Sequence, residues 1–363
     1  MKILSIVGTR PNFMKIAPLV REFRKRRIRH VLVHTGQHYD REMSQLFFDQ
    51  LQLPKPDVNL GIGSGTVVEQ VGRILIALEK VLTDEKPDIV VVVGDVNSTF
   101  AGAFAAKQLG IPVAHVEAGL RSFDWSMPEE INRVLTDRIS GYLFTTEESA
   151  NRNLLNEGRS RKDIHFVGNV MIDTLLAHRR EAASSTILQR LHLSGKGYGV
   201  LTLHRPSNVD TKKSLASVIS IIGELQKAIP IVFPIHPRTR RSIQSFGLGP
   251  VVGKMKNLTL TPPLGYLDFL CLMDNARIVL TDSGGIQEET TALGVPCITL
   301  RKNTERPVTL SHGTNLLVSM KKGKILAAAR KAMSHHQKAG RMPPLWDGKA
   351  ARRIVQLLKQ FIQ

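Results

Sequence analysis

The first half of the chain alternates short apolar runs with longer amphipathic stretches. The apolar runs are rich in β-branched residues and lie at residues 3–8, 30–36, 88–95, 112–119, 142–146 and 164–169. Segments such as 13–25, 69–82 and 99–110, between these runs, place apolar residues three or four positions apart. Continuous apolar strands are typical of a parallel sheet that helices cover on both faces. The pattern predicts a doubly wound α/β domain.

The second half repeats this scheme. Its apolar runs lie at residues 198–204, 230–237, 258–264, 277–285, 296–301 and 315–319, and helical stretches such as 215–227 separate them. A chain of 363 residues is long for one core. We therefore predict two Rossmann-like doubly wound domains, 1–168 and 169–348, facing a cleft, with a last helix at about 349–363 returning to the first domain.

Composition places the chain among ordinary globular proteins, with 42% hydrophobic and 22% charged residues. It shows no signal-peptide pattern and no apolar stretch of about 18 residues, so we expect a cytoplasmic protein without membrane contact. Cys271 and Cys297 lie in apolar surroundings, which favours buried structural thiols over a disulfide or a metal ligand. No pattern resembles a zinc site.

The net charge is +19, from 50 basic and 31 acidic residues. Nucleic-acid binding would require basic residues on one face, ideally with interleaved aromatics. The basic residues here are scattered in small runs, and aromatic residues make up only 5%. The charge therefore favours a solvated surface that attracts an anionic small substrate.

Charged residues follow the predicted strands of the first half. Arg10 and Lys15 come after the first strand, where they could hold a phosphate or form a charged surface turn. Asp95 and Glu117 each stand where an apolar run stops. Asp95 is as consistent with a helix N-cap as with catalysis, whereas Glu117 is a poor capping residue.

A further acidic residue begins the helix predicted at 127–138. Glu129 and Arg133 are four positions apart on one helical face, the spacing of a simple salt bridge. In the second half, His204 and His236 end two successive strands. Acids, a base and cations at strand ends are what proton transfer beside a phosphate-bearing leaving group requires.

The stretch TDSGGIQEE at 281–289 leaves an apolar strand through two glycines. Gly284 and Gly285 let the backbone approach a ligand closely, and the helix that follows has a positive end suited to phosphate. The alternative is an ordinary turn with Ser283 as N-cap. Arg306 supplies a further cation for a diphosphate.

Eight sequence motifs, taken together, resemble those of one protein family. They occur in order between about residues 1 and 320 and are GTRPNFMKIAPL, TGQHYD, GDVNST, HVEAGLRS, MPEEINRVLTD, LTLHR, TDSGGIQEE and TERPVT. The series resembles the non-hydrolysing UDP-N-acetylglucosamine 2-epimerases. The resemblance implies the two-domain fold called GT-B and a homodimer, with a role in cell-surface polysaccharide biosynthesis.

The resemblance also implies the reaction. UDP-GlcNAc would be converted reversibly to UDP-ManNAc by loss and re-addition of UDP through a 2-acetamidoglucal, and no cofactor such as NAD would be needed. The C2 proton is not acidic by itself, so departure of UDP must accompany its removal. Cations must then stabilise UDP while carboxylates act on the sugar.

The family motifs assign roles to residues of this chain. Asp95, Glu117 and Glu129 would be the acid/base carboxylates, Arg133 would position Glu129, and His204 would assist departure of UDP. The remaining residues would bind UDP, with Phe269 near uracil and Glu289 on the ribose hydroxyls: Arg10, Lys15, His236, Phe269, Ser283, Gly284, Gly285, Glu289 and Arg306.

Two positions depart from the family pattern. Asn12 stands where many members have glutamate, and Ser207 stands where a glutamate often precedes Asn208. The motifs leave open whether the sugar is GlcNAc itself or a 3-acetamido, 6-carboxyl or 6-deoxy variant, and whether a second UDP-GlcNAc activates the enzyme.

Three other functions remain as alternatives. A glycosyltransferase of the same fold would require an acceptor-binding surface in the first half. A hydrolysing epimerase would release free ManNAc, although its bifunctional versions carry a kinase domain for which the chain has no room. A polyanion binder would use the net charge, and its binding to DNA would depend on salt.

Overall fold

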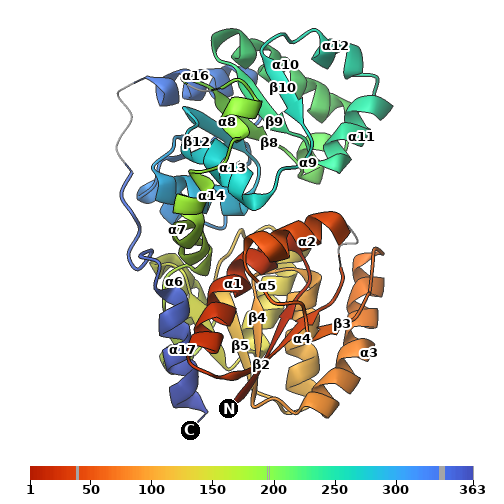
Figure 1. Cartoon of the computed structure of the whole chain (residues 1–363), viewed down its shortest axis with the longest axis vertical. Helices are drawn as coiled ribbons and strands as arrows, with labels where there is room; N and C mark the ends of the chain where they lie inside the picture. Colours follow the sequence, from red (N-terminus) through yellow and green to blue (C-terminus); the bar gives the residue numbers. More distant parts are fainter. Residues whose placement is uncertain (38–40, 194, 196, 335–339, 363) are drawn as a thin grey trace. The chain divides into compact units, whose positions relative to one another are not determined.

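The computed structural model describes residues 1–37, 41–193, 195, 197–334 and 340–362 (Figure 1). It divides into two compact units. Unit 1 comprises Met1–Ala177 and Pro344–Gln363, and unit 2 comprises His178–Pro343. The sequence predicts the first boundary at residue 168, nine residues before its position in the structure.

Unit 1 is a parallel sheet flanked by helices (Figure 1). Its elements are β1 (Lys2–Val7), α1 (Arg10–Lys25), β2 (Arg29–His34), α2 (Arg41–Gln50), β3 (Val58–Asn59), α3 (Val67–Glu85), β4 (Ile89–Val93), α4 (Asn97–Gln108), β5 (Val113–Ala118), α5 (Pro128–Ile139), β6 (Tyr142–Thr145), α6 (Glu148–Asn156), η1 (Arg161–Asp163), β7 (Ile164–Phe166) and α17 (Ala350–Phe361). Helix α7 (Val170–Ala182) begins in unit 1 and continues beyond its boundary at Ala177.

The seven strands of this sheet run in the order β3-β2-β1-β4-β5-β6-β7, and all their pairings are parallel. In the central register, Ile3 of β1 lies opposite His30 of β2 and Ile89 of β4. All five residues of β4 are buried, as a central strand covered on both faces requires.

Unit 2 repeats the architecture with six parallel strands in the order β10-β9-β8-β11-β12-β13. Its elements are α8 (Ile187–Arg190), β8 (Gly199–Thr202), α9 (Pro206–Val209), α10 (Lys212–Ala228), β9 (Ile231–Pro234), α11 (Pro237–Ser245), α12 (Gly249–Gly253), β10 (Leu258–Thr261), α13 (Tyr266–Asp274), β11 (Ile278–Thr281), α14 (Gly284–Leu293), β12 (Cys297–Thr299), α15 (Val308–Ser311), β13 (Asn315–Leu317) and α16 (Lys322–Met333).

The predicted fold class is confirmed, and every predicted strand is present. The structure adds one strand that the pattern does not indicate, the two-residue β3 at the edge of the first sheet. Several strands end earlier than their apolar runs, as β11 does at Thr281, because the following residues turn towards a helix. Cys271 and Cys297 are free and buried, as predicted.

Local signals explain where helices begin. The Thr66 hydroxyl accepts a hydrogen bond from the Glu69 backbone N–H at 3.3 Å, and the Glu69 carboxylate accepts one from the Thr66 N–H at 2.8 Å. This capping box satisfies two backbone donors at the start of α3. No described helix is long and apolar enough to span a membrane.

The last helix, α17, belongs to unit 1 and packs against α1. Asp173 of α7 fixes its start, since the carboxylate accepts hydrogen bonds from the Ala350 N–H at 3.1 Å and the Ala351 N–H at 2.7 Å. Just before this helix, the buried Trp346 donates through Nε1 to the carbonyl oxygen of Thr146 at 2.9 Å. These contacts, far apart in sequence, make the C-terminal segment part of unit 1.

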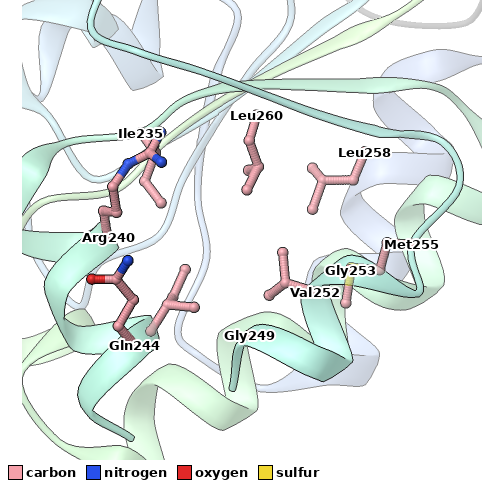
Figure 2. A pocket seen from close by; sticks show the side chains of 10 residues that line it. Ile235, Arg240, Gln244, Gly249, Val252, Gly253, Met255, Leu258 and Leu260 are labelled. Atoms are coloured by element: carbon pink, nitrogen blue, oxygen red, sulfur yellow. The ribbon is translucent and has the colours of Figure 1, made fainter. Parts of the chain in front are cut away.

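A pocket of about 340 Å³ lies in unit 2 beside the edge strand β10 (Figure 2). Aliphatic side chains such as Ile243, Val252 and Leu258 line it, together with Arg240 and Gln244. Its lining includes none of the site residues predicted from the sequence, so this pocket is not the predicted nucleotide site.

Candidate active site

Strand order locates one candidate region in each unit. Doubly wound proteins bind ligands outside the carboxyl ends of the strands, where the strand order reverses. In unit 1 that point lies between β1 and β4, which lead to Arg10 and Asp95. In unit 2 it lies between β8 and β11, which lead to His204 and Asp282. The topology therefore directs attention to the charged residues that follow these four strands.

Asp95 follows β4 across a turn that requires glycine. Gly94 has a φ of +72°, and a Cβ there would lie 2.6 Å from Nζ of Lys15. The turn presents the Asp95 carboxylate to Arg133, whose Nε lies 3.1 Å from Asp95 Oδ2. Asn132 also donates to the Asp95 carbonyl oxygen at 3.0 Å. Helix α5 thus holds both the backbone and the side chain of Asp95.

Glu117 near the end of β5 has an unusual backbone. Its φ is +77°, in the left-handed region that residues with a Cβ rarely adopt, and the pairing of β5 with β6 shifts register between Val116 and Ala118. The buried carboxylate lies against the buried Lys15, with Nζ at 2.8 Å from both Oε1 and Oε2. The local strain turns a side chain of the sheet towards a cation on α1.

Arg133 does not have the carboxylate partner that its spacing suggests. It pairs with Asp95 and with Glu130 three residues earlier, and Glu129 lies exposed on the same helix. Glu130 is itself fixed, because it accepts hydrogen bonds from the Ser122 N–H at 2.9 Å and the Phe123 N–H at 2.9 Å. Glu130, three residues before Arg133, therefore forms the ion pair that the spacing in the sequence suggests for Glu129.

The remaining predicted residues of unit 1 lie on α1. Arg10 is half-buried, with its guanidinium carbon 5.8 Å from the centre of the Phe47 ring. Asn12 is buried, accepts hydrogen bonds from the backbone N–H groups of Gly8 and Thr9, and donates to the Val93 carbonyl oxygen at 2.9 Å. An ionised glutamate could not make that last bond, because it has no hydrogen to donate.

In unit 2, a buried aspartate that sequence analysis overlooks orders the turn after β8. Asp282 Oδ1 lies 3.1 Å from Nδ1 of His204, and its oxygens accept from the Arg205 N–H and from Nδ2 of Asn208, each at 3.0 Å. Burial raises the pKa of the Asp282 carboxyl, but His204, Asn208 and Arg205 outweigh burial and leave it below its usual value. Its position directly after an apolar strand, like that of Asp95, is the signal that could have revealed it.

Gly284 lies against a buried cluster of charges. A Cβ at this position would lie 2.5 Å from both Nη1 of Arg306 and Oε1 of Glu305, so a larger residue would have to displace this ion pair. Arg306 pairs with Glu305 and, through Nε at 2.9 Å, with Glu288. Arg301 also pairs with Glu305, at 2.8 Å. Glu288, Glu305 and Arg301 are further charged residues that sequence analysis overlooks.

Glu289, on the first turns of α14, differs from Glu288 in its side-chain partner. Its carboxyl group is buried and accepts a hydrogen bond from the hydroxyl of Tyr266 at 3.2 Å. Burial raises the pKa of Glu289 to about 8, against the opposing effect of the Tyr266 hydrogen bond. Burial and the nearby Glu289 also raise the pKa of Tyr266 well above its usual value.

Four further predicted site residues belong to unit 2. His236 caps α11 by accepting from the Arg238 N–H at 3.2 Å, and its ring centre lies 6.0 Å from that of His204. Ser283 occupies the N-cap position of α14, and in the described part of the chain its hydroxyl makes no capping bond. Gly285 lies on the first turn of α14, and Phe269 is half-buried on α13.

Within each unit, the structure brings several of the predicted residues together. Unit 1 joins Lys15 to Glu117 and Asp95 to Arg133, and unit 2 brings His204 near His236 and Gly284 against Arg306. Glu129 stands apart on an exposed surface. Residues 38–40 of the TGQHYD motif lie outside the described residues.

Two parallel α/β units with acidic, basic and cationic groups at their strand ends define an enzyme of the doubly wound class. The family model for UDP-N-acetylglucosamine 2-epimerase matches residues 21–359. The chain belongs to this family.

Individual relatives give the same result. The chain is 47% identical over 363 residues to a UDP-N-acetylglucosamine 2-epimerase of Methanocaldococcus jannaschii, covering 99% of each. It is 42% identical to a UDP-2,3-diacetamido-2,3-dideoxy-D-glucuronate 2-epimerase of Pseudomonas aeruginosa, over 99% of this chain and 100% of the relative. A crystal structure of the Methanocaldococcus jannaschii enzyme with UDP-GlcNAc and UDP has a TM-score of 0.93 at 46% identity, covering 99% of this chain and 100% of that one.

Proposed function

We propose that this protein epimerises UDP-GlcNAc at C2 of the sugar and thereby interconverts it with UDP-ManNAc. Family membership supports the reaction, and the relative crystallised with UDP-GlcNAc and UDP supports the substrate. The route we propose is elimination of UDP to give a 2-acetamidoglucal, followed by re-addition of UDP after a proton returns to the other face of C2.

The backbone of Glu117 is the observation that carries this proposal. A non-glycine residue in the left-handed region costs about 1–3 kcal/mol, and such strain clusters at functional sites. In Glu117 the strain coincides with a buried carboxylate held 2.8 Å from Nζ of Lys15. Lys15 also holds this carboxylate in one position, which an acid/base group requires. Lys15 therefore serves Glu117 in this proposal, in place of the UDP contact expected from sequence.

The acid/base groups in the proposal are Asp95, Glu117 and Glu129, which remove the C2 proton and return it. Arg133 holds Asp95 through the 3.1 Å contact with its carboxylate. Glu129 is exposed at the first turn of α5, and the ion pairs of Arg133 with Asp95 and Glu130 do not involve it.

In the proposal, residues of unit 2 bind UDP. Ser283, Gly284 and Gly285 offer the diphosphate a helix start without an intervening Cβ, and Arg306 supplies a charge there. In the proposal, Glu289 binds the ribose hydroxyls, and Phe269 packs near uracil. Asp282 fixes the ring of His204 through Nδ1, which directs Nε2 to the departing UDP.

The proposed elimination is tested with UDP-GlcNAc carrying ¹⁸O in the bond between the anomeric carbon and the diphosphate. If UDP leaves and returns, rotation of its terminal phosphate moves the label into non-bridging positions, which ³¹P NMR detects. Retention of all the label in the bridge during epimerisation would exclude departure of UDP. Parallel assays with a UDP-2,3-diacetamido-glucuronate substrate decide between the two sugars on which the relatives are named to act.

The family resemblance also supports a homodimer, which we propose as the working form. Val68 and Ile76 on α3 are 81% and 76% exposed, and Phe104 on the neighbouring α4 is 36% exposed. Exposed apolar side chains on adjacent helices are candidates for a protein interface. Light scattering with Ile76→Glu against Glu79→Gln on the same helix tests this: a monomer for the first variant alone supports the face, and an unchanged mass for both excludes it.

A further inference from the structure

A chain of buried charged side chains lies beside the ends of β4 and β5. His115 of β5 contacts the Asp137 carboxylate of α5 through Nδ1 at 2.7 Å. Asp137 in turn pairs with Arg121 at 2.7 Å and accepts from the Gly119 N–H at 3.0 Å. His115, Asp137 and Arg121 are at most 3% exposed, so water does not share in these interactions.

The other ring nitrogen of His115 has an acceptor as well. Nε2 lies 2.8 Å from the carbonyl oxygen of Gly94, which can only accept a hydrogen bond. Burial raises the pKa of the Asp137 carboxyl, but His115 and Arg121 outweigh burial and hold it below its usual value, so Asp137 also accepts. Nε2 of His115 is therefore the donor to Gly94, and Asp137 holds the ring from the side of Nδ1.

The contact with Gly94 reaches the residue next to Asp95. The Gly94 N–H donates to the Val116 carbonyl oxygen at 3.0 Å, and the Gly94 carbonyl oxygen accepts from His115. Strand β5 therefore holds both hydrogen-bonding groups of Gly94, whose φ of +72° sets the direction in which the chain enters Asp95.

We propose that His115 is a positioning residue that fixes Asp95 by clamping the Gly94 carbonyl oxygen through Nε2–H. The inference rests on the proposed acid/base function of Asp95. It assigns to the buried Asp137 the task of orienting the ring of His115 through Nδ1. Loss of the clamp lets Asp95 shift from its productive position, and small displacements of a catalytic group lower turnover strongly.

Two substitutions separate the contacts of His115. The amide nitrogen of asparagine takes the place of Nδ1 and keeps the bond to Asp137, whereas that of glutamine takes the place of Nε2 and keeps the bond to Gly94. We expect His115→Asn to lower kcat by about 10- to 100-fold with KM little changed, and His115→Gln to retain most of the activity. Equal loss in both variants, or wild-type kcat in folded His115→Asn, would overturn the clamp.

The donor role of Nε2 is measured in the wild-type protein without reference to activity. Uniform ¹⁵N-histidine labelling shows all twelve histidines, and His115 is assigned by the signal that disappears in His115→Gln. We expect Nε2 of His115 to show an attached proton, as the bond to the Gly94 carbonyl oxygen requires. An unprotonated Nε2 would overturn the inference. Absence of epimerase activity with a protonated Nε2 would instead refute the proposed function alone.

Discussion

Contacts with two residues of α5 fix both the side chain and the backbone of Asp95. Arg133 contacts its carboxylate at 3.1 Å, and Asn132 contacts its carbonyl oxygen at 3.0 Å. Such support from α5 keeps an acid/base group in position, which is a condition for efficient proton transfer. Sequence analysis identifies Asp95 from its place after a strand, but it cannot identify these partners, which lie 37 and 38 residues away.

Replacing Asp95 with asparagine keeps the shape and removes the charge. We expect turnover to fall by about 10²-fold or more, because an acid/base group contributes on that order. The affinity for UDP should stay near the wild-type value, since the residues proposed to bind the diphosphate lie in unit 2. Kinetics and calorimetric UDP titration measure both, with Asp84→Asn on the exposed side of α3 as the control. Turnover within about threefold of the wild type would remove Asp95 from the acid/base groups.

Glu289 predicts a dependence of stability on pH. Burial raises its pKa to about 8 in the folded protein, from 4.5 for an ordinary glutamate, so the folded state keeps this proton more tightly than the unfolded chain. The unfolded chain releases the proton first as pH rises, and the contribution of Glu289 to the free energy of unfolding falls between about pH 4.5 and 8.

Urea unfolding of the wild type and of Glu289→Gln at several pH values measures this contribution. The free energy of unfolding of the wild type, relative to that of the variant, should decrease from about pH 5 to pH 8 and then level off. A difference that stays constant over this interval would show that Glu289 is already ionised in the folded protein.

The periodicity of apolar residues predicts most of the helices and strands. It does not predict the contacts between them. Apolar runs identify strands such as β4 and β11 because a central parallel strand is buried on both faces. The edge strand β3 has only two residues and leaves no such signal. On α5 the spacing allows either Glu129 or Glu130 to face Arg133, and only tertiary contacts of Glu130 with Ser122 and Phe123 decide for Glu130.

The start of α17 depends on one carboxylate from another helix. Burial raises the pKa of Asp173 to about 6, although the Ala350 and Ala351 N–H groups that it accepts from oppose this shift. We expect Asp173→Ala to lower the free energy of unfolding by about 1–2 kcal/mol, as for loss of a helix cap. Urea unfolding against Asp84→Ala measures the effect, and equal stability of the two variants would show that α17 does not depend on this contact.

The two units share one strand order and differ in the chemistry at their strand ends. Unit 1 gathers carboxylates with compensating cations, and unit 2 gathers the glycine-rich helix start and the Arg306 cluster. Motifs in the sequence were sufficient to predict this division. The ion pairs within it were not predictable, because partners such as Lys15 and Glu117 are 102 residues apart and meet only through the fold.

The central claim is that the protein inverts C2 of UDP-GlcNAc through removal of the C2 proton. Proton NMR of the purified protein with UDP-GlcNAc in D₂O tests it directly. We predict that anomeric signals of UDP-ManNAc grow to a constant ratio with those of UDP-GlcNAc while deuterium replaces hydrogen at C2. Unchanged UDP-GlcNAc, with UDP still raising the melting temperature, would contradict the proposed substrate, and epimerisation that retains the C2 hydrogen would contradict the proposed mechanism.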